Sequence, residues 1–172
     1  QGCADLAGDQ IVPVNIVGKE YIVVKGTLNV TDKVYMMPVQ NNTTISVGGV
    51  SQGTFAQGQV FEHNLTTPSI YIQSSAPVYV LHYTGYGCEI GSALVPPITC
   101  TGSNSVCVVR STTENFSITL FTKTANTAGF TLNGNAALIP AAAFSVVPGT
   151  GGLYSQAPVS YTHLTLPTKA SV

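Results

Sequence analysis

A serine flanked by glycines is the first feature of this sequence that could do chemistry. Gly49-Val50-Ser51-Gln52-Gly53 spells G-x-S-x-G, the pattern of the nucleophile elbow of serine hydrolases. That chemistry needs a helix after the serine, and an acid and a histidine that can reach its hydroxyl group. Here strand-like residues follow, and Glu62 and His63 are neighbours whose side chains point to opposite faces of a strand. We therefore interpret the glycines as turn residues and predict no catalytic residue.

The acidic residues do not indicate a second kind of reaction. A glycosidase needs two carboxyl groups about 5 to 10 Å apart across a cleft, and no spacing here selects a pair. We expect surface solvation and capping of strand ends instead. Calcium binding by Asp5 and Asp9 has no support from an EF-hand or nonapeptide pattern, so no metal site and no cofactor are predicted. The seven acidic residues are Asp5, Asp9, Glu20, Asp32, Glu62, Glu89 and Glu114.

The four cysteines favour disulfides over a metal site. Cys3, Cys88, Cys100 and Cys107 contain no C-x-x-C pair, and no histidine lies at the short, regular spacing that zinc sites use. Disulfides would place the chain outside the cytosol. Cys100 and Cys107 flank the loop-like segment TGSNSV and are the pair for which we predict a bridge, whereas the pairing of Cys3 and Cys88 is left open.

Three tyrosines are the candidate ligand surface. Tyr71, Tyr83 and Tyr86 could offer flat faces to a sugar, although tyrosines in strands more often pack as cross-strand pairs, which is the favoured interpretation. His82 lies between Leu81 and Tyr83, and we expect it to be a hydrogen-bonded structural histidine.

The elements that must position these residues are strands. β-Branched and aromatic residues dominate several short segments, and Gly-Thr, Asn-Asn and Gly-Gly turn signals separate them at roughly 8 to 12 residues. The Ala-rich segment GNAALIPAAAF is predicted to be strand and loop, because Pro140 interrupts it. The chain is therefore predicted to be all-β. The expected strands cover residues 21–24, 34–37, 44–47, 70–72, 78–81, 116–120 and 130–132.

The order of these segments indicates a duplication. A shift of about 85 residues superposes Cys3 on Cys88, Ile45 on Phe130 and Val47 on Leu132, and Ala76-Pro77-Val78 matches Ala157-Pro158-Val159 at a slightly smaller shift. We expect two tandem antiparallel β-sandwich-like repeats of about 85 residues, over 1–86 and a truncated 87–158. Two β-propeller-like blades per repeat are the alternative.

The last residues do not follow the repeat. Residues 159–172, which contain VSYTHLTLPT, resemble the translation of a sequencing adapter. We interpret this segment as a non-native read-through tail and the chain as a fragment of a longer protein.

Composition excludes several classes of partner. Only 8% of residues are charged, against about a quarter in typical proteins, and the net charge is -1. There is no basic patch for nucleic acid. The apolar runs are far shorter than the roughly 20 residues of a membrane span, so membrane insertion is not predicted.

Several segments in order carry a family resemblance. GCADLAGDQIVPVNIVGKEYIVV, NNTTISVGG, GQVFEHNL and IYIQSSAPVYVLHY resemble successive parts of the IgGFc-binding protein N-terminal domain family, over most of residues 2–98 and weakly in the second copy. The resemblance implies a secreted, β-rich module of a larger extracellular protein, of the kind that bacterial surface proteins also carry. In the second copy, the segment GSNSVCVV replaces Gly-Lys-Glu-Tyr. The resemblance therefore does not imply a ligand surface common to both copies.

The expected function is therefore binding. We expect a non-catalytic extracellular or cell-surface adhesion module that contacts a protein or glycan ligand and neighbouring domains of the same chain. A structural stalk or spacer repeat is the alternative, and a serine hydrolase using Ser51 is the third possibility.

Overall fold

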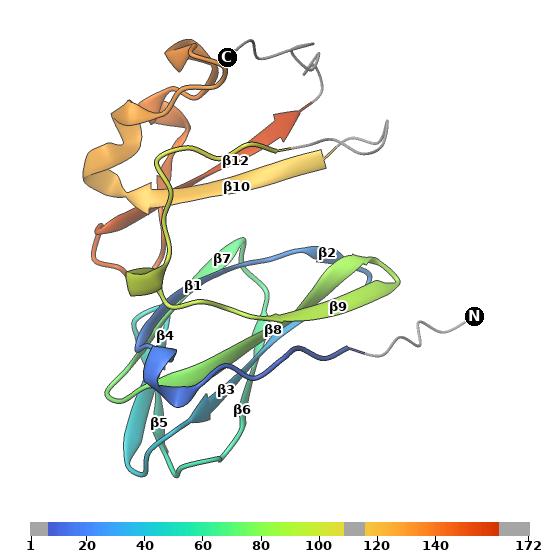
Figure 1. The fold of residues 1–172 in the computed structure, drawn as a ribbon, viewed down its shortest axis with the longest axis vertical. Coiled ribbons are helices and arrows are strands. Elements are labelled where there is room, and N and C mark those ends of the chain that lie inside the picture. The colour runs from blue at the N-terminus through green and yellow to red at the C-terminus, as the bar shows by residue number, and fades with distance from the viewer. Residues whose placement is uncertain (1–6, 109–115, 162–172) are drawn as a thin grey trace. The chain divides into compact units, whose positions relative to one another are not determined.

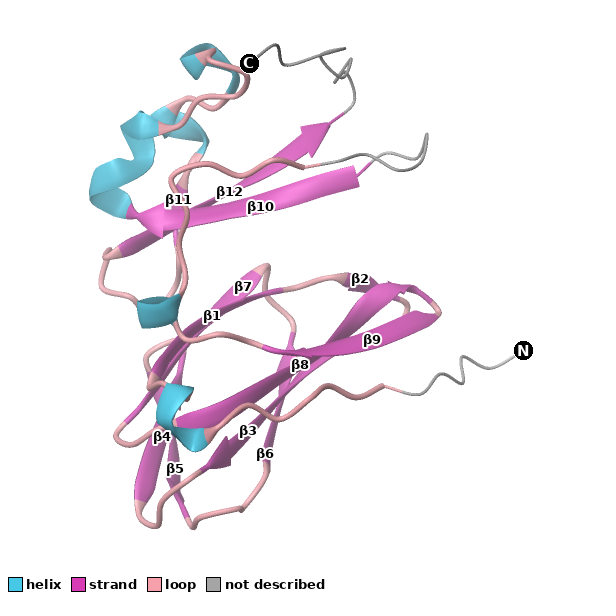
Figure 2. Cartoon of the chain, viewed as in Figure 1, coloured by secondary structure: helices cyan, strands magenta, loops and turns pink. Residues whose placement is uncertain are grey.

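The computed structural model describes residues 7–108 and 116–161 of the 172-residue chain. These residues confirm the all-β prediction, since strands dominate and the described helices are short 3-10 turns (Figures 1 and 2). The chain divides into two compact units. The first contains Gln1–Asn104 with Val147–Gly152, and the second contains Ser105–Val146 with Leu153–Val172.

The first unit is built from two sheets. Sheet A is antiparallel and has the order β1 (Glu20–Val24), β7 (Ser69–Ser74), β4 (Thr43–Val47), β5 (Val50–Phe55). Sheet B has the order β2 (Thr27–Leu28), β8 (Val78–Gly87), β3 (Asp32–Pro38), β6 (Phe61–Leu65), and β9 (Glu89–Leu94) also pairs with β8. Two 3-10 turns, η1 (Val14–Ile16) and η2 (Ile98–Cys100), lie before β1 and after β9.

The two sheets bury one common apolar core. Residues 32, 34, 36 and 38 of β3 are buried and the residues between them are not, as expected for a strand with one face toward the core. Burying such side chains is the main force that stabilises the unit. The core takes Tyr21, Ile45 and Ile72 from sheet A and Val34, Met36 and Val80 from sheet B. The first unit is thus a β-sandwich.

Two hairpins fix the connections of the sandwich. Gly48 and Gly49 join β4 to β5 with φ values of 60° and 83°, the left-handed conformation that a two-residue type I′ turn requires. The hairpin of β8 and β9 passes through residues 86 and 87, where the boundary between repeats was predicted. Because these strands are hydrogen-bonded to one another, the first compact unit continues to Asn104.

The second unit contains a three-stranded antiparallel sheet. Its order is β10 (Phe116–Lys123), β12 (Tyr154–Tyr161), β11 (Ser145–Val146). The connection between β10 and β11 forms three 3-10 turns, η3 (Thr124–Gly129), η4 (Ala136–Leu138) and η5 (Ala141–Ala143). The rings of Phe130 and Phe144 pack with centroids 5.1 Å apart.

Two expectations for this unit were wrong. Residues 130–132 form no strand, and Leu132 makes only an isolated bridge to Asn135. The Ala-rich segment contains η4 and η5 where strand and loop were predicted. Pro140 does interrupt it, since it is the N-cap of η5 with φ of -68°, close to the helical φ that proline prefers.

The duplication stays a prediction. Val78 begins β8, and its aligned partner Val159 lies in β12, where it pairs with Ile118 of β10. However, Ile45 and Val47 lie in β4, whereas their aligned partners lie outside the strands of the second unit. Residues 159–161 of the predicted tail belong to β12, and 162–172 lie outside the described residues.

Candidate functional site

The structure does not assemble a serine-hydrolase site around Ser51. Gly49 is a turn residue, as predicted, and Ser51 follows it in β5, an edge strand of sheet A. Glu62 and His63 lie in β6 of sheet B. Among the described residues, no hydrogen bond joins the Ser51 hydroxyl to a carboxylate or an imidazole.

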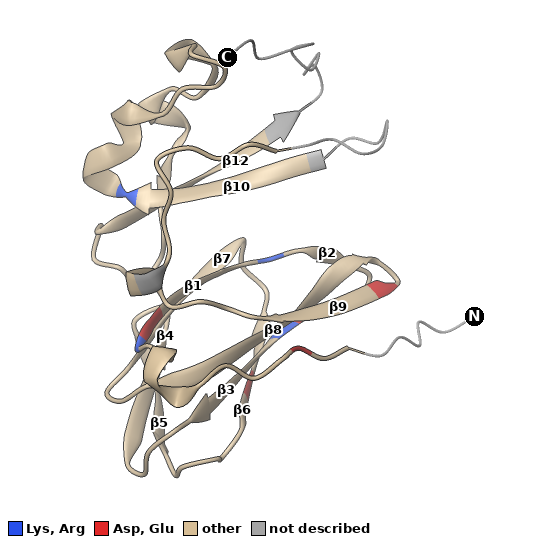
Figure 3. Ribbon diagram, viewed as in Figure 1, with Lys and Arg blue, Asp and Glu red and all other residues tan. Residues whose placement is uncertain are grey.

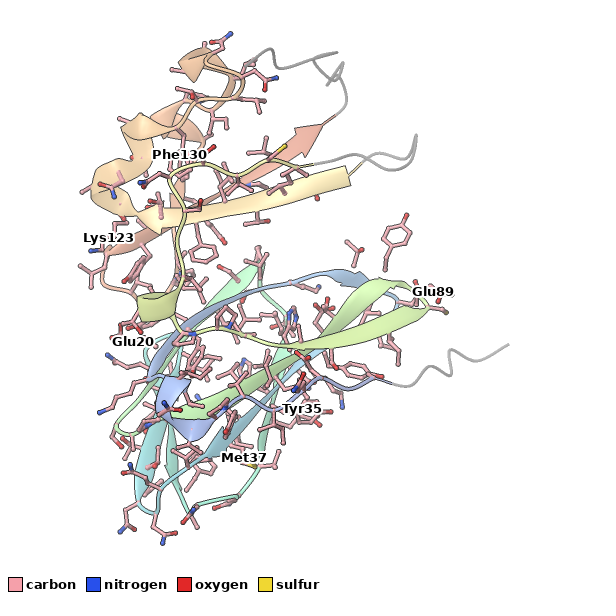
Figure 4. All side chains as sticks on the ribbon, viewed as in Figure 1. Glu20, Tyr35, Met37, Glu89, Lys123 and Phe130 are labelled. Atoms are coloured by element: carbon pink, nitrogen blue, oxygen red, sulfur yellow. The ribbon has the colours of Figure 1, made fainter. Side chains whose placement is uncertain are left out.

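The described carboxylates are scattered over the first unit. Figure 4 shows Glu20 at the start of β1 and Glu89 at the tip of the β8–β9 hairpin, which are well separated. Glu62 is paired with Lys33 at 2.8 Å. Asp9 accepts a hydrogen bond from the Leu94 N–H at 2.6 Å, and such bonds from backbone amides lower the pKa of this carboxyl. Asp5 lies outside the described residues, and the described ones contain no group of three metal-ligating side chains.

Asp32 departs from the expectation of a surface or capping role, because its side chain is fully buried. Its Oδ2 accepts hydrogen bonds from the Gly26 N–H at 2.6 Å and the Thr84 hydroxyl at 2.6 Å, and it lies 3.0 Å from His82 Nε2. Its Oδ1 is buried without a partner in the described part of the chain. The period-two pattern places Asp32 on the core face of β3, which is the signal that could have revealed its burial.

His82 is the hydrogen-bonded histidine that the sequence predicted. Burial lowers its pKa below the usual value, and the Asp32 carboxylate opposes this effect. His63 lies on the other side of Val34 in the same sheet, and burial lowers its pKa as well. Burial thus favours the neutral form of both imidazoles. The Asp32–His82 pair is a structural contact because, among the described residues, the hydroxyl that bonds to Asp32 is that of Thr84, and it donates its proton to the carboxylate.

The three predicted tyrosines do not form one surface. Tyr71 lies in β7 of sheet A and is only 6% exposed, so its ring cannot stack on a ligand. Tyr83 and Tyr86 lie in β8 of sheet B, three residues apart and hence on opposite faces of the strand. Tyr86 is 78% exposed and is the accessible member of the set.

The cysteine prediction also needs a correction. Cys107 is exposed and has a free thiol, so the structure does not contain the predicted Cys100–Cys107 bridge. Cys88 is disulfide-bonded. Cys3 lies outside the described residues.

The structure reveals a polar row across the outer face of sheet A. In the strand register, Ser51 is opposite Ser46, Ser46 is opposite Gln73, and Gln73 is opposite Glu20. The row therefore joins four strands, and an open groove runs along part of it, with Thr44 and Ser75 also in its lining. Sequence reasoning missed this site because its members are spread over the chain and come together only through the register.

The hydrogen bonds within the row leave part of it available. Gln73 Nε2 donates to Glu20 Oε1 at 3.3 Å, and the Ser46 hydroxyl donates to the Gln73 carbonyl at 3.4 Å. The hydroxyl of Ser51, which is an exposed residue, has no hydrogen-bond partner within the described residues. Hydroxyl and amide groups are both donors and acceptors, so the part of the row formed by Ser51, Ser46 and Gln73 can bind an uncharged polar surface without burying an ion.

A second concavity of the first unit is apolar. The segment before β1 and the residues after β9 enclose a cavity of about 150 Å³ with Tyr21 and Tyr79 in its lining. Charged residues are sparse over the whole first unit (Figure 3), and none of them lines this cavity. None of the described helices is long and apolar enough to cross a membrane.

The sandwich and the polar row of sheet A define a β-sheet protein. A model of the IgGFc binding protein family matches residues 1–169, and the chain belongs to this family. The match includes residues 159–169, so it does not separate the predicted tail from the rest. Comparisons with curated proteins and with solved structures found no match.

Proposed function

We propose that this chain is a non-catalytic adhesion module that acts outside the cell and binds a protein ligand through the polar row of sheet A. The observation that carries the proposal is the row itself, in which Ser51, Ser46 and Gln73 lie side by side on the outer face of the sheet. Ser51 lies in an edge strand, and the row exposes hydroxyl and amide groups. These features suit an uncharged protein interface that contains bound water. Family membership supports a binding function.

Two further features support the extracellular part of the proposal. Cys88 is disulfide-bonded, as expected in an oxidising compartment. The low charge of the chain suits a surface that contacts neutral groups and does not steer ions. The proposed partners are a protein ligand and the neighbouring domains of the same longer chain.

The Fc region of immunoglobulin G is the first ligand to test, because the family description names it. Surface plasmon resonance would compare immobilised Fc with the unchanged chain, with Ser51→Lys and with Thr66→Lys. Ser51→Lys introduces a charge into the row and is expected to weaken binding at least about tenfold, because an unpaired charge would be desolvated. Thr66→Lys also replaces a hydroxyl side chain with lysine, at an exposed position outside the row, and should bind normally.

Three outcomes would contradict parts of the proposal. If Fc does not bind the unchanged chain, Fc is not the ligand. If adhesion of the longer protein survives replacement of this module by an unrelated spacer of equal length, the module is a stalk element. Labelling by a fluorophosphonate probe that depends on Ser51 would instead indicate a hydrolase.

A further inference from the structure

The apolar cavity lies directly behind an exposed segment of backbone. Val12, Ile16 and Val17 form one wall, residues 94–97 form another, and Tyr21 and Tyr79 complete the lining. A dry apolar cavity of about 150 Å³ accepts a group of about the size of benzene. This volume therefore suits one branched aliphatic or prolyl side chain.

The two tyrosine hydroxyls in the lining are already hydrogen-bonded within the chain. The Tyr79 hydroxyl donates to the Val12 carbonyl at 2.6 Å, and the Tyr21 hydroxyl donates to the Val78 carbonyl at 2.7 Å. Both phenol groups are thus already engaged. A charged group entering the cavity would lose its hydration without a partner, whereas an apolar group gains from leaving water.

The segment beside the cavity has the features of a strand edge. Residues 7–13 have neither helical nor strand structure, and Pro13 has φ and ψ of -59° and 144°, which is an extended conformation. Two contacts hold the segment in place, the Tyr79–Val12 bond and the bond from the Leu94 N–H to Asp9. The backbone N–H groups of Ile11 and Val12 have no hydrogen-bond partner in the described part of the chain.

The rim of the cavity is also apolar. Ile11 is 70% exposed, Val14 is 54% exposed and Ile16 is 49% exposed, and all three belong to this segment or to the turn that follows it. Apolar side chains that cluster next to a pocket are typical of protein contact sites. Free backbone donors next to a side-chain pocket are the combination that binds extended peptides.

We propose that residues 8–12 and the cavity behind them form a docking site for an extended, uncharged segment of a protein partner. The segment pairs its backbone with Ile11 and inserts one branched aliphatic or prolyl side chain into the cavity. This site is separate from the polar row, and it rests on the proposed function only in taking the partner to be a protein. A free small apolar molecule would fill the cavity without contacting the Ile11 backbone.

A panel of blocked peptides tests the site without knowledge of the natural partner. Ac-Ser-Thr-X-Thr-Ser-NH2 with X as Ile, Pro, Ala or Lys would be titrated into the isotope-labelled chain and followed by NMR. The Ile and Pro peptides should shift the signals of Ile11, Val12, Val80 and Leu94. The Ala peptide should bind at least about tenfold more weakly than the Ile peptide, because it leaves most of the cavity empty, and the Lys peptide should not bind.

Filling the cavity provides the matching variant. Val12→Phe places a ring in the cavity and should abolish binding of the Ile peptide, whereas Val30→Phe makes the same change at a position that is 64% exposed and outside the cavity. Amide spectra and thermal unfolding establish that both variants fold, and Ile16→Phe replaces Val12→Phe if that variant does not.

Equal binding of the Ile and Ala peptides, or binding unaffected by the filled cavity, would overturn the proposal. Benzene that shifts the same signals when no peptide does would indicate a small-molecule pocket instead. Because Ser51→Lys should leave peptide binding unchanged, failure here is distinguishable from failure of the polar-row proposal.

Discussion

At the scale of single residues, we expect the buried carboxylate of Asp32 to be important for the stability of the first unit. Its buried carboxylate is the common acceptor for a backbone amide and a hydroxyl group and lies 3.0 Å from the imidazole of His82. A buried charge is tolerated only when its hydrogen bonds are made, and its partners in turn become unpaired when it is removed.

We therefore predict that Asp32→Ala lowers the free energy of unfolding by about 3–5 kcal/mol, because it leaves buried donors unsatisfied. Glu62→Ala is the control, since it removes a carboxylate whose partner Lys33 is exposed, and it should have a much smaller effect. Urea unfolding followed by circular dichroism measures both. Equal effects of the two variants would show that the Asp32 contacts do not stabilise the fold.

The buried histidines predict a dependence of stability on pH. Burial lowers the pKa of His82 and of His63 in the folded state, so the unfolded chain binds protons at a higher pH than the folded chain does. The free energy of unfolding should therefore fall as the pH is lowered from about 7.5 to about 6. His82→Gln should flatten this dependence. Urea unfolding across this range is the measurement, and stability that rises on acidification would contradict the assignment.

At the scale of elements, a contact between glycines joins segment 147–152 to the β4–β5 turn of the same unit. Gly149 has a φ of 84°, and a Cβ atom there would overlap the backbone of Gly48 and Gly49. The nearby Gly151 also has a positive φ, of 60°, but a Cβ atom there would meet no other atom within 4 Å. Comparing substitutions at the two positions therefore separates the cost of a left-handed backbone conformation from the cost of a steric overlap.

Gly149→Ala is accordingly predicted to destabilise the chain more than Gly151→Ala. The second variant bears only the cost of a left-handed residue, about 1–2 kcal/mol, whereas the first must also displace the turn. Thermal unfolding of the two variants tests the difference. Similar losses would mean that residues 147–152 can move away from the turn at no cost.

At the scale of the whole molecule, we expect sparse charge and exposed apolar residues to limit solubility. The net charge is -1 and the isoelectric point is about 6.3, so there is little repulsion between copies near neutral pH. Leu153 is 67% exposed and Val146 is 52% exposed in the second unit. Exposed apolar side chains of this kind favour association.

We expect Leu153→Glu to raise the solubility at pH 7 more than Gln57→Glu does, as measured by precipitation with polyethylene glycol. Both changes add one negative charge, and only the first removes an exposed apolar side chain. If the two variants gain equally, net charge alone limits solubility and the apolar residues of the second unit do not matter.

The sequence by itself determined the strand content, the Gly48–Gly49 turn, the structural role of His82 and the family, because each depends on local pattern or on a run of residue types. The polar row, the burial of Asp32 and the cavity behind Val12 were decided by the tertiary structure, because strand register and the packing of two sheets bring distant residues together. The same reason explains the error in the cysteine prediction. The pairing of Cys107 required knowledge of where its side chain points and what lies beside it, which residue spacing does not contain.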